Sequence, residues 1–321
     1  MRVTENTNYD VVRESIRRGR EKMQELQYQS TTLKKLNQPS DDPVGAAKVL
    51  EMRTDKLNND QYQVNAKIAE AFLNNTDHAI FELSEIVLRA KEIAINQSSA
   101  ASSSEETRLG VSEEVIQLFK QAVAIGNCRV GDRYLFGGYK TQKPPVGPEG
   151  SFLGDDGQMM LEIANDVFLS MNVPGSDVFN TSPPRGGIDG ASAYRGSEAR
   201  DDGELDALPE NVNLFEELQH FRIALLTGDL EGVRSTLERF DQIYSKLIAT
   251  RAKIGSRMQG LQSTSQAIER HNITNAMLSS SLEDADMAQV VSDLGKEETV
   301  FRSSLASSKR LIQPTLLDFL K

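Results

Sequence analysis

The side chains most able to do chemistry are few and lie far apart in this chain. The histidines, His78, His220 and His271, have no Cys or His partner at the spacing of a metal site. The single cysteine, Cys128, cannot form a disulfide within the chain, and we interpret it as a small packing residue. No phosphate loop or nucleophile motif accompanies the serines. The pattern predicts a protein that is not an enzyme and has no catalytic residue, cofactor or metal site.

Two acidic turns are the remaining candidates for binding an ion. Asp155-Asp156-Gly157 and Asp201-Asp202-Gly203 lack the spaced oxygen ligands of a calcium loop, so we interpret both as turns. The net charge of −11 argues against nucleic acid and anionic membranes as partners. No apolar stretch is long enough to span a bilayer, and the N-terminus lacks the apolar centre of a cleavable signal peptide.

The composition favours long helices over a compact enzyme. The 321 residues are 38% hydrophobic and only 6% aromatic, with no Trp. Helices that pack through small and aliphatic residues need few bulky anchors. We therefore expect a mainly α fold, a long antiparallel helical rod with terminal coiled-coil helices and a small β-rich insert domain.

An apolar stripe at alternating steps of three and four residues marks each end of the chain. Such a stripe covers one side of a helix and must be buried against another helix. Small or polar residues interrupt both stripes, so the two could pair with each other or with neighbouring copies, or could be the core of a stable monomer. The expected assembly interface consists of Tyr9, Val12, Ile16, Met23, Leu26 and Leu33, and of Val291, Leu294, Phe301, Leu305 and Ile312.

Two long helices are predicted between these ends. Asp42 and Pro43 suit the N-cap and first residue of a helix over 43–95, and a second helix is expected over 229–281. Each would be about 80 Å long, so an antiparallel pair is the natural arrangement. The first helix repeats apolar residues every seven positions at Leu50, Leu57, Val64 and Ala71, and in a shifted register at Ile80, Val87 and Ala94 and at Ala79, Ile86 and Ile93. The second does so at Val233, Phe240, Leu247, Ile254, Leu261, Ile268 and Leu282, with Asn275 in the polar slot.

Between the helices the chain becomes rich in Gly, Pro, Asp and Ser. Residues 159–163 and 167–173 are strand candidates that a short turn could join into a hairpin. We predict five segments: an N-terminal assembly helix (1–38), the first half of the rod (39–133), the β-rich outer insert (134–207), the second half of the rod (208–283) and a C-terminal assembly helix (284–321).

A run of five residues near the N-terminus, Pro39, Ser40, Asp41, Asp42 and Pro43, is continued by Val-Gly-Ala-Ala. This segment is similar to the N-terminal signature of the hook–filament junction family (FlgL-type, flagellar hook-associated protein 3) within the flagellin-like superfamily. Flagellins usually have Ala-Ala where this chain has Pro43-Val44. Three further segments resemble family motifs: 133–141, which contains Tyr134, Phe136, Gly137 and Gly138; 278–286; and the ending 315–320.

The resemblance implies a structural adaptor that joins the hook, through the first junction protein, to the flagellin filament. Copies would form an axial ring through paired terminal helices. It further implies a place in the extracellular flagellum, export without a cleaved signal peptide, and an export chaperone that shields the C-terminal helix. The alternatives are a flagellin filament subunit and a cytoplasmic coiled-coil scaffold.

Overall fold

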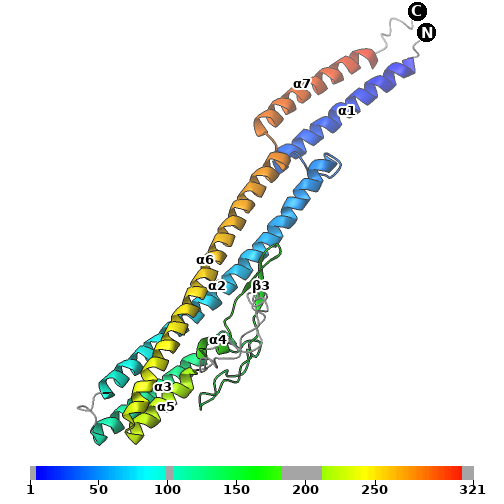
Figure 1. Ribbon diagram of the computed structural model, residues 1–321. Coiled ribbons are helices and arrows are strands. Elements are labelled where there is room, and N and C mark those ends of the chain that lie inside the picture. Colours follow the sequence, from blue (N-terminus) through cyan, green and yellow to red (C-terminus); the bar gives the residue numbers. More distant parts are fainter. Residues whose placement is uncertain (1–4, 99–103, 182–211, 313–321) are drawn as a thin grey trace, which may run out of the picture. The chain divides into compact units, whose positions relative to one another are not determined.

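The computed structural model describes residues 5–98, 104–181 and 212–312, with side chains described from residue 10 to residue 308 within these ranges (Figure 1). The described residues divide into two compact units. Unit 1 combines residues 1–59 with 269–321, and unit 2 comprises residues 60–268. The elements are α1 (Glu5–Thr32), α2 (Pro43–Gln97), α3 (Glu105–Gly126), β1 (Arg129–Val130), β2 (Arg133–Tyr134), β3 (Met160–Ala164), β4 (Val167–Ser170), α4 (Gly175–Phe179), α5 (Leu214–Thr227), α6 (Leu230–Glu283) and α7 (Met287–Ile312). The predicted mainly α fold with a small β insert is confirmed.

Helix α2 begins at the predicted cap. The Asp42 side chain accepts hydrogen bonds from the backbone N–H groups of Val44 (3.1 Å) and Gly45 (3.0 Å), and Pro43 is the first helical residue. Asn213 caps α5 in the same way, by accepting from the backbone of Phe215 (2.9 Å). These caps satisfy N–H groups that have no partner in the first helical turn, which is why short polar side chains stand at these positions.

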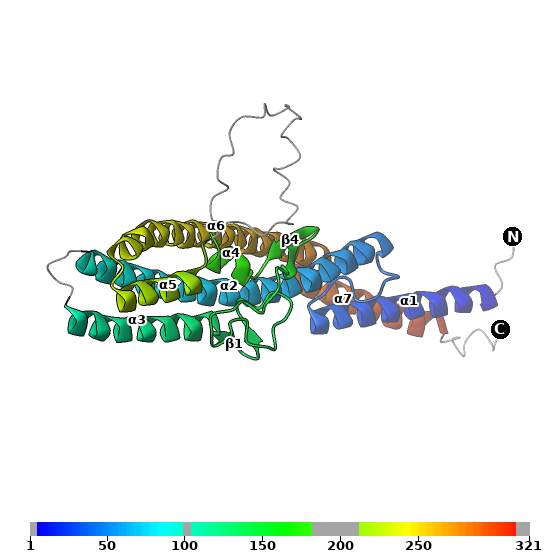
Figure 2. The same ribbon diagram turned by 60° about the horizontal axis from the view of Figure 1, so that its bottom comes forward.

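Unit 2 holds the hydrophobic core. The α2 and α6 segments in it run antiparallel, as the ion pairs Asp77–Arg251 (2.9 Å) and Lys91–Asp241 show. Helices α3 and α5 pack against each other beside them (Figure 2). The seven-residue repeat of α6 is buried here as predicted, and so are both shifted repeats of α2. The buried members of the α6 repeat are Val233, Phe240, Leu247, Ile254, Leu261 and Ile268.

One predicted seam of α2 is wrong. Leu50, Leu57 and Val64 are 66%, 70% and 51% exposed, and Ala71 is exposed too. The residues that face α6 lie two positions further along α2. This buried stripe includes Ala66 and continues from there at steps of three and four residues. Two residues turn a helix by about 200°, so the leucines point away from the partner helix. Both stripes repeat every seven residues, and only the position of α6 decides which one is covered.

The described part of the insert, residues 134–181, is small and mostly irregular. Strands β3 and β4 form the predicted antiparallel hairpin, with Leu161 opposite Leu169 and a turn at Asp166 (φ 57°). Strand β4 ends at Ser170, before the predicted end at residue 173. The hairpin is tied to α2 through Glu162: its carboxylate accepts from the Tyr62 hydroxyl (3.1 Å) and its carbonyl from the Asn65 amide (2.8 Å).

A buried carboxylate in unit 2 leads to a pH prediction. Glu217 is 2% exposed, and its Oε1 has no hydrogen-bond partner. Burial raises its pKa, although Arg239 and His220, which both approach Oε2, oppose the rise. Because the folded pKa exceeds the unfolded one, this group favours folding below the unfolded pKa, and that contribution is lost as pH rises through the folded pKa.

We therefore expect Glu217→Gln to gain stability relative to the wild type as pH rises from 4 to 8, by about 1 kcal/mol. Urea unfolding at several pH values measures this difference. The neighbouring Glu216 is exposed, so Glu216→Gln is the matched control and should show no such trend. Parallel pH profiles for the two variants would contradict the assignment.

Candidate assembly interface

The terminal helices α1 and α7 pack side by side in unit 1 (Figure 1). A Cβ added at Gly19 of α1 would lie 3.4 Å from the Phe301 ring of α7, so the glycine leaves room for that ring. Leu26 of α1 and Val290 of α7 are the buried aliphatic residues of this pair among its described side chains, at 7% and 6% exposure. The two helices are therefore packed together, but their contact buries few of the described aliphatic side chains.

The predicted interface residues differ in burial. Leu26 is buried, whereas Leu33, Val291 and Leu305 are 55%, 57% and 44% exposed. At the start of α7 the buried position is Val290, one residue before the predicted Val291. The side chains of Tyr9 and Ile312 lie outside the described ones. The half-buried members are Val12, Ile16, Met23, Leu294 and Phe301.

Shallow grooves lie along the contact between α1 and α7. One is lined by Val11, Val300 and Phe301, among others, and another by Met23, Leu294 and Leu305. Val11 and Val300 are 64% and 54% exposed. Aliphatic side chains therefore remain at the surface even after the two helices have paired.

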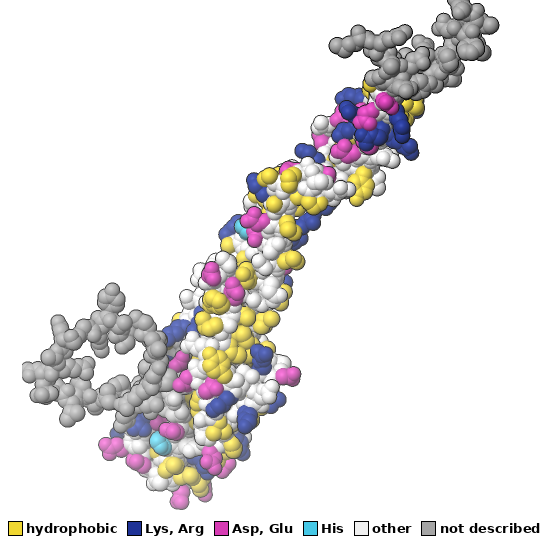
Figure 3. Space-filling view, turned by 90° about the vertical axis from the view of Figure 1, so that its right-hand side faces the viewer, with side chains coloured by type: hydrophobic (Ala, Val, Ile, Leu, Met, Phe, Trp, Pro, Cys, Tyr) yellow, Lys and Arg dark blue, Asp and Glu magenta, His cyan; other side chains and the backbone are white. Residues whose placement is uncertain are grey.

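The described side chains of unit 1 bury very little apolar surface. Of the 41 buried hydrophobic residues described, three lie in unit 1: Leu26, Val49 and Val290. Twelve large hydrophobic side chains of the same unit are exposed (hydrophobic groups are yellow in Figure 3). They are Val11, Tyr28, Leu33, Val44, Leu50, Leu57, Ile273, Met277, Leu278, Val291, Val300 and Leu305. Exposed apolar surface of this extent, in a unit with almost no core, indicates an interaction surface.

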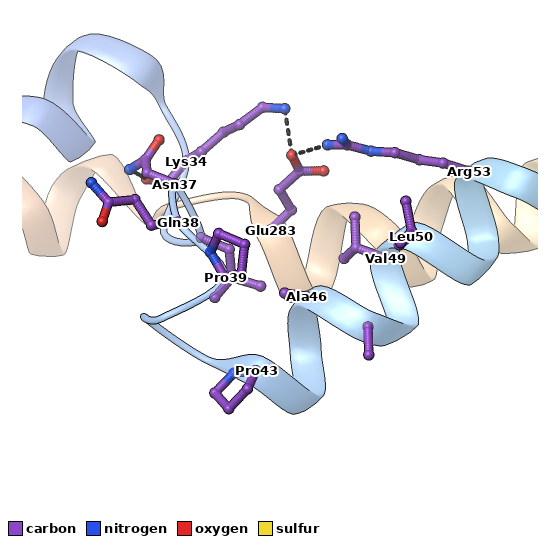
Figure 4. Close-up of a pocket in the computed structure, with 12 residues that line it drawn as sticks. Lys34, Asn37, Gln38, Pro39, Pro43, Ala46, Val49, Leu50, Arg53 and Glu283 are labelled. Carbon is purple, nitrogen blue, oxygen red and sulfur yellow. Dashed lines mark hydrogen bonds and ion pairs between the residues drawn. The ribbon is translucent and has the colours of Figure 1, made fainter.

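The linkers that enter and leave the terminal helices meet at Glu283. Its carbonyl accepts from the backbone N–H of Lys35 (2.7 Å), and the N–H of Ala285 donates to the Leu33 carbonyl (3.0 Å). Its carboxylate, on a residue 8% exposed, pairs with Lys34 (2.5 Å) and with Arg53 (Figure 4). Leu33 has a φ of 60°, which turns the chain out of α1. These bonds hold the ends of α1 and α6 and the start of α7 together.

The next turn contains the family motif. The Asp41 carboxylate accepts from the backbone N–H groups of Asn37 (3.1 Å) and Gln38 (2.9 Å), and Asp42 caps α2. Both aspartates therefore stabilise the turn by accepting hydrogen bonds from nearby backbone N–H groups. The turn, the start of α2 and Glu283 enclose a mainly apolar pocket of about 590 Å³, whose lining includes Pro39, Pro43 and Leu50 (Figure 4).

The ion pairs of Glu283 lead to a prediction that two variants destabilise this linkage to different degrees. The double variant Lys34→Gln with Arg53→Gln leaves a buried carboxylate without a counter-ion. We expect it to lower the local stability of the linkage by about 3 kcal/mol. Glu283→Gln removes the buried charge itself, and the cations can be hydrated, so its cost should be nearer 1 kcal/mol. Hydrogen exchange at the Lys35 amide, which donates to the Glu283 carbonyl, reports on this linkage. Equal acceleration of exchange in the two variants would contradict the account.

The second family motif lies in unit 2 and builds a loop. Tyr134 and Phe136 are buried, and the Phe136 ring packs on Phe179 with centroids 5.3 Å apart. Gly138 has a φ of 66°, and a Cβ there would lie 2.0 Å from the Asp155 carboxylate. A Cβ at Gly137 would lie 2.6 Å from the Lys140 carbonyl oxygen. The glycines permit close backbone approach, and the motif packs against other segments of the insert.

Charges on the outer face of α1 pair within the helix. Glu14 accepts hydrogen bonds from Arg17 and Arg18, which lower its pKa to about 2.

Within the described parts of the chain, no group of three or more His, Cys, Asp or Glu side chains could hold a metal ion, and no helix is long and apolar enough to cross a bilayer. The acidic turn at Asp155 bonds its own neighbours instead: its carboxylate accepts from the backbone of Tyr139 and Gly157. The turn at 201–203 lies outside the described residues.

The ion pairs of Glu283 with Lys34 and Arg53 were not predicted from the sequence. Segment 278–286 resembled a family motif, but nothing in it showed that Glu283 would meet Lys34 and Arg53, which are 249 and 230 residues away. The exposed outer faces of α2 and α6 were also missed, because the leucine repeat at 50 and 57 was assigned to the wrong side of its helix. Distant pairing and helix phase leave no local signal in one sequence.

Comparison with known proteins gives consistent matches. Residues 3–141 match the bacterial flagellin N-terminal helical region. The chain is 22% identical over 280 residues to flagellar hook-associated protein 3 of Escherichia coli strain K12, which covers 86% of each chain. It is 23% identical over 306 residues to a flagellin of Listeria monocytogenes, over 95% of this chain and 94% of that one.

Solved structures support the same fold. The flagellar junction protein FlgL from Legionella pneumophila superimposes with a TM-score of 0.55 at 16% identity, over 74% of this chain and 100% of that chain. The resemblance inferred from the motifs is confirmed. The chain matches the bacterial flagellin N-terminal helical region over residues 3–141 and resembles flagellar hook-associated protein 3 over most of its length.

Proposed function

We propose that this chain is a structural subunit of the bacterial flagellum, located at the junction between hook and filament. The observation that carries the proposal is the reversed burial among the described side chains of unit 1, of which three hydrophobic ones are buried and twelve large ones are exposed. Unit 2 has its own core. A subunit with one self-sufficient unit and one that lacks a core suits a building block that completes its folding by assembly.

The partners follow from that location. Copies of the chain associate through α1 and α7 into an axial ring, with the hook-side junction protein on one side and flagellin on the other. The exposed valines and leucines of α1 and α7 supply the apolar surface. An export chaperone shields the C-terminal helix before assembly, and the protein reaches the extracellular flagellum without cleavage of a signal peptide. The assembly interface remains the set of residues named from the sequence.

The five segments keep their roles in this proposal. Helices α1 and α7 are the assembly helices, and α2 and α6 with their neighbours form the two halves of the helical rod. The outer insert begins at residue 134, and the structure describes it as far as residue 181. Because the named relatives are structural flagellar proteins, no catalytic role is assigned.

A flagellin role is the second candidate, since flagellins match at similar identity. A strain lacking this protein separates the two. We expect electron microscopy to show hooks without filaments, and the culture medium to contain soluble flagellin, because filament subunits are exported but cannot attach. Hooks without filaments and a medium without flagellin would identify the chain as the filament subunit. Normal filaments would overturn both.

A further inference from the structure

The pocket between the turn at 37–42 and the start of α2 combines apolar walls with two cations (Figure 4). Pro39, Pro43 and Val49 contribute aliphatic surface to it, and Lys34 and Arg53 line the same space. Its volume of about 590 Å³ lies in the range of cavities that hold a ligand. The pocket is therefore large enough to take an apolar side chain from another molecule.

Both cations have N–H groups to spare. Lys34 and Arg53 donate to the same oxygen, Oε1 of Glu283. A guanidinium carries five N–H groups and an ammonium three, so this shared oxygen uses only part of their capacity. Their side chains are 43% and 56% exposed, whereas that of Glu283 is 11% exposed. Two cations and one carboxylate give the pocket lining a net charge of +1.

One side of α2 continues this surface as a docking stripe, which consists of Leu50, Arg53 and Leu57. The three residues follow one another at steps of three and four, so they lie within about 60° of one another around the helix. Leu50, which lines the pocket, and Leu57 are 66% and 70% exposed. The docking stripe thus presents a cation between two aliphatic side chains, at the spacing by which one helix packs on another.

The charge of Arg53 decides which kind of helix fits the docking stripe. A purely apolar partner would remove the guanidinium from water, and the only carboxylate it bonds, Glu283, is already shared with Lys34. That desolvation is unfavourable unless the partner supplies a counter-ion. A carboxylate can accept charge-assisted hydrogen bonds from the remaining N–H groups of Arg53, and a basic partner would be repelled.

We infer that the pocket and the docking stripe bind a helix of a neighbouring flagellar subunit, one that carries Asp or Glu between two apolar residues on its exposed side. One apolar side chain of that helix enters the pocket, and its carboxylate bonds Arg53. The inference rests on the proposed function and adds to the terminal helices a contact whose partner is selected by charge.

Photo-cross-linking in assembled flagella tests this contact. The full chain is produced in motile cells with p-benzoyl-phenylalanine in place of Leu50, purified flagella are irradiated, and mass spectrometry identifies the attached peptide. We expect a helical segment of another subunit with Asp or Glu within one turn of the attachment site. The same probe in place of the exposed Glu51, about 100° round the helix, should give about tenfold less product.

Charge reversal then tests the role of Arg53. Arg53→Glu should lower the yield of cross-linked product about tenfold, and replacing the partner's acidic residue by Arg should restore it. Arg53→Lys keeps the charge and should keep the product. Lys48 is exposed about 140° round the helix from Arg53, so Lys48→Glu is the matched control and should leave the yield unchanged.

The outcomes separate this inference from the proposed function. If the chain is present in purified flagella but gives no product at position 50, or attaches to a segment without a nearby carboxylate, the docking is wrong while the junction role stands. Failure of the reversed pair to restore what Arg53→Glu loses, whether product or incorporation into flagella, also overturns the docking. Absence of the unmodified chain from purified flagella would overturn the proposed function itself.

Discussion

Filaments will fail to attach to hooks when Leu26 is replaced by Asp, while unit 2 stays folded. Leu26 is 7% exposed between α1 and α7. A carboxylate there must be desolvated without a partner, or the helices must separate, and either costs about 3 kcal/mol or more. The pair buries too little apolar surface to tolerate that loss. Phe301→Asp should act in the same way from the other helix.

The measurement combines two readouts. Electron microscopy counts hooks that carry filaments, and urea unfolding of the purified chain follows the core of unit 2, which contains 38 of the 41 buried hydrophobic residues described. Gln24→Asp places the same charge on an exposed position of α1, about 200° round the helix from Leu26, and should assemble normally. Normal numbers of filaments with Leu26→Asp would refute the role of α1 and α7 in assembly.

A second large effect is expected in unit 2, from Gly138→Ala. The added Cβ would lie 2.0 Å from the carboxylate of Asp155 and 2.2 Å from its backbone oxygen, in a residue with a φ of 66°. The same carboxylate accepts from the Tyr139 amide (2.6 Å) and the Gly157 amide (3.1 Å). Relieving the overlap breaks these bonds, so we expect the free energy of unfolding to fall by about 3 kcal/mol or more.

Gly131→Ala is the matched control for this prediction. Gly131 has a φ of 59°, but no atom lies within 4 Å of the position of an added Cβ. Only the strain of a left-handed conformation remains, which should cost about 1 kcal/mol. Urea unfolding followed by circular dichroism measures both variants. Equal losses would mean that the close approach to Asp155 contributes nothing.

Much of the fold could be predicted because local rules govern it. Asp42 caps α2, and Pro43 begins it, because both residues are suited to the first turn of a helix wherever it lies. The repeat from Val233 to Ile268 was buried as predicted, since α6 offers no competing apolar stripe of that length. The hairpin at residues 160–170 followed from two short strand candidates separated by a turn at residues 164–166.

The candidate site was predictable only in part. The terminal stripes indicated that α1 and α7 need partners, yet they did not show that Val290 rather than Val291 would be buried. Helix phase is sensitive to one residue, because each step turns the side chain by about 100°. A stripe with polar interruptions does not define that phase closely.

The sequence by itself determined the start of α2 at Pro43, the bounds of the two long helices to within two residues, and their antiparallel arrangement, because caps and periodicity are local properties. Only the tertiary structure decided which of two equal stripes on α2 faces α6, and that Glu283 joins Lys34 to Arg53. The reason is physical: leucines at 50 and 57 are equally suited to burial against a helix of the same chain or against a neighbouring molecule, and the partner's position makes that choice.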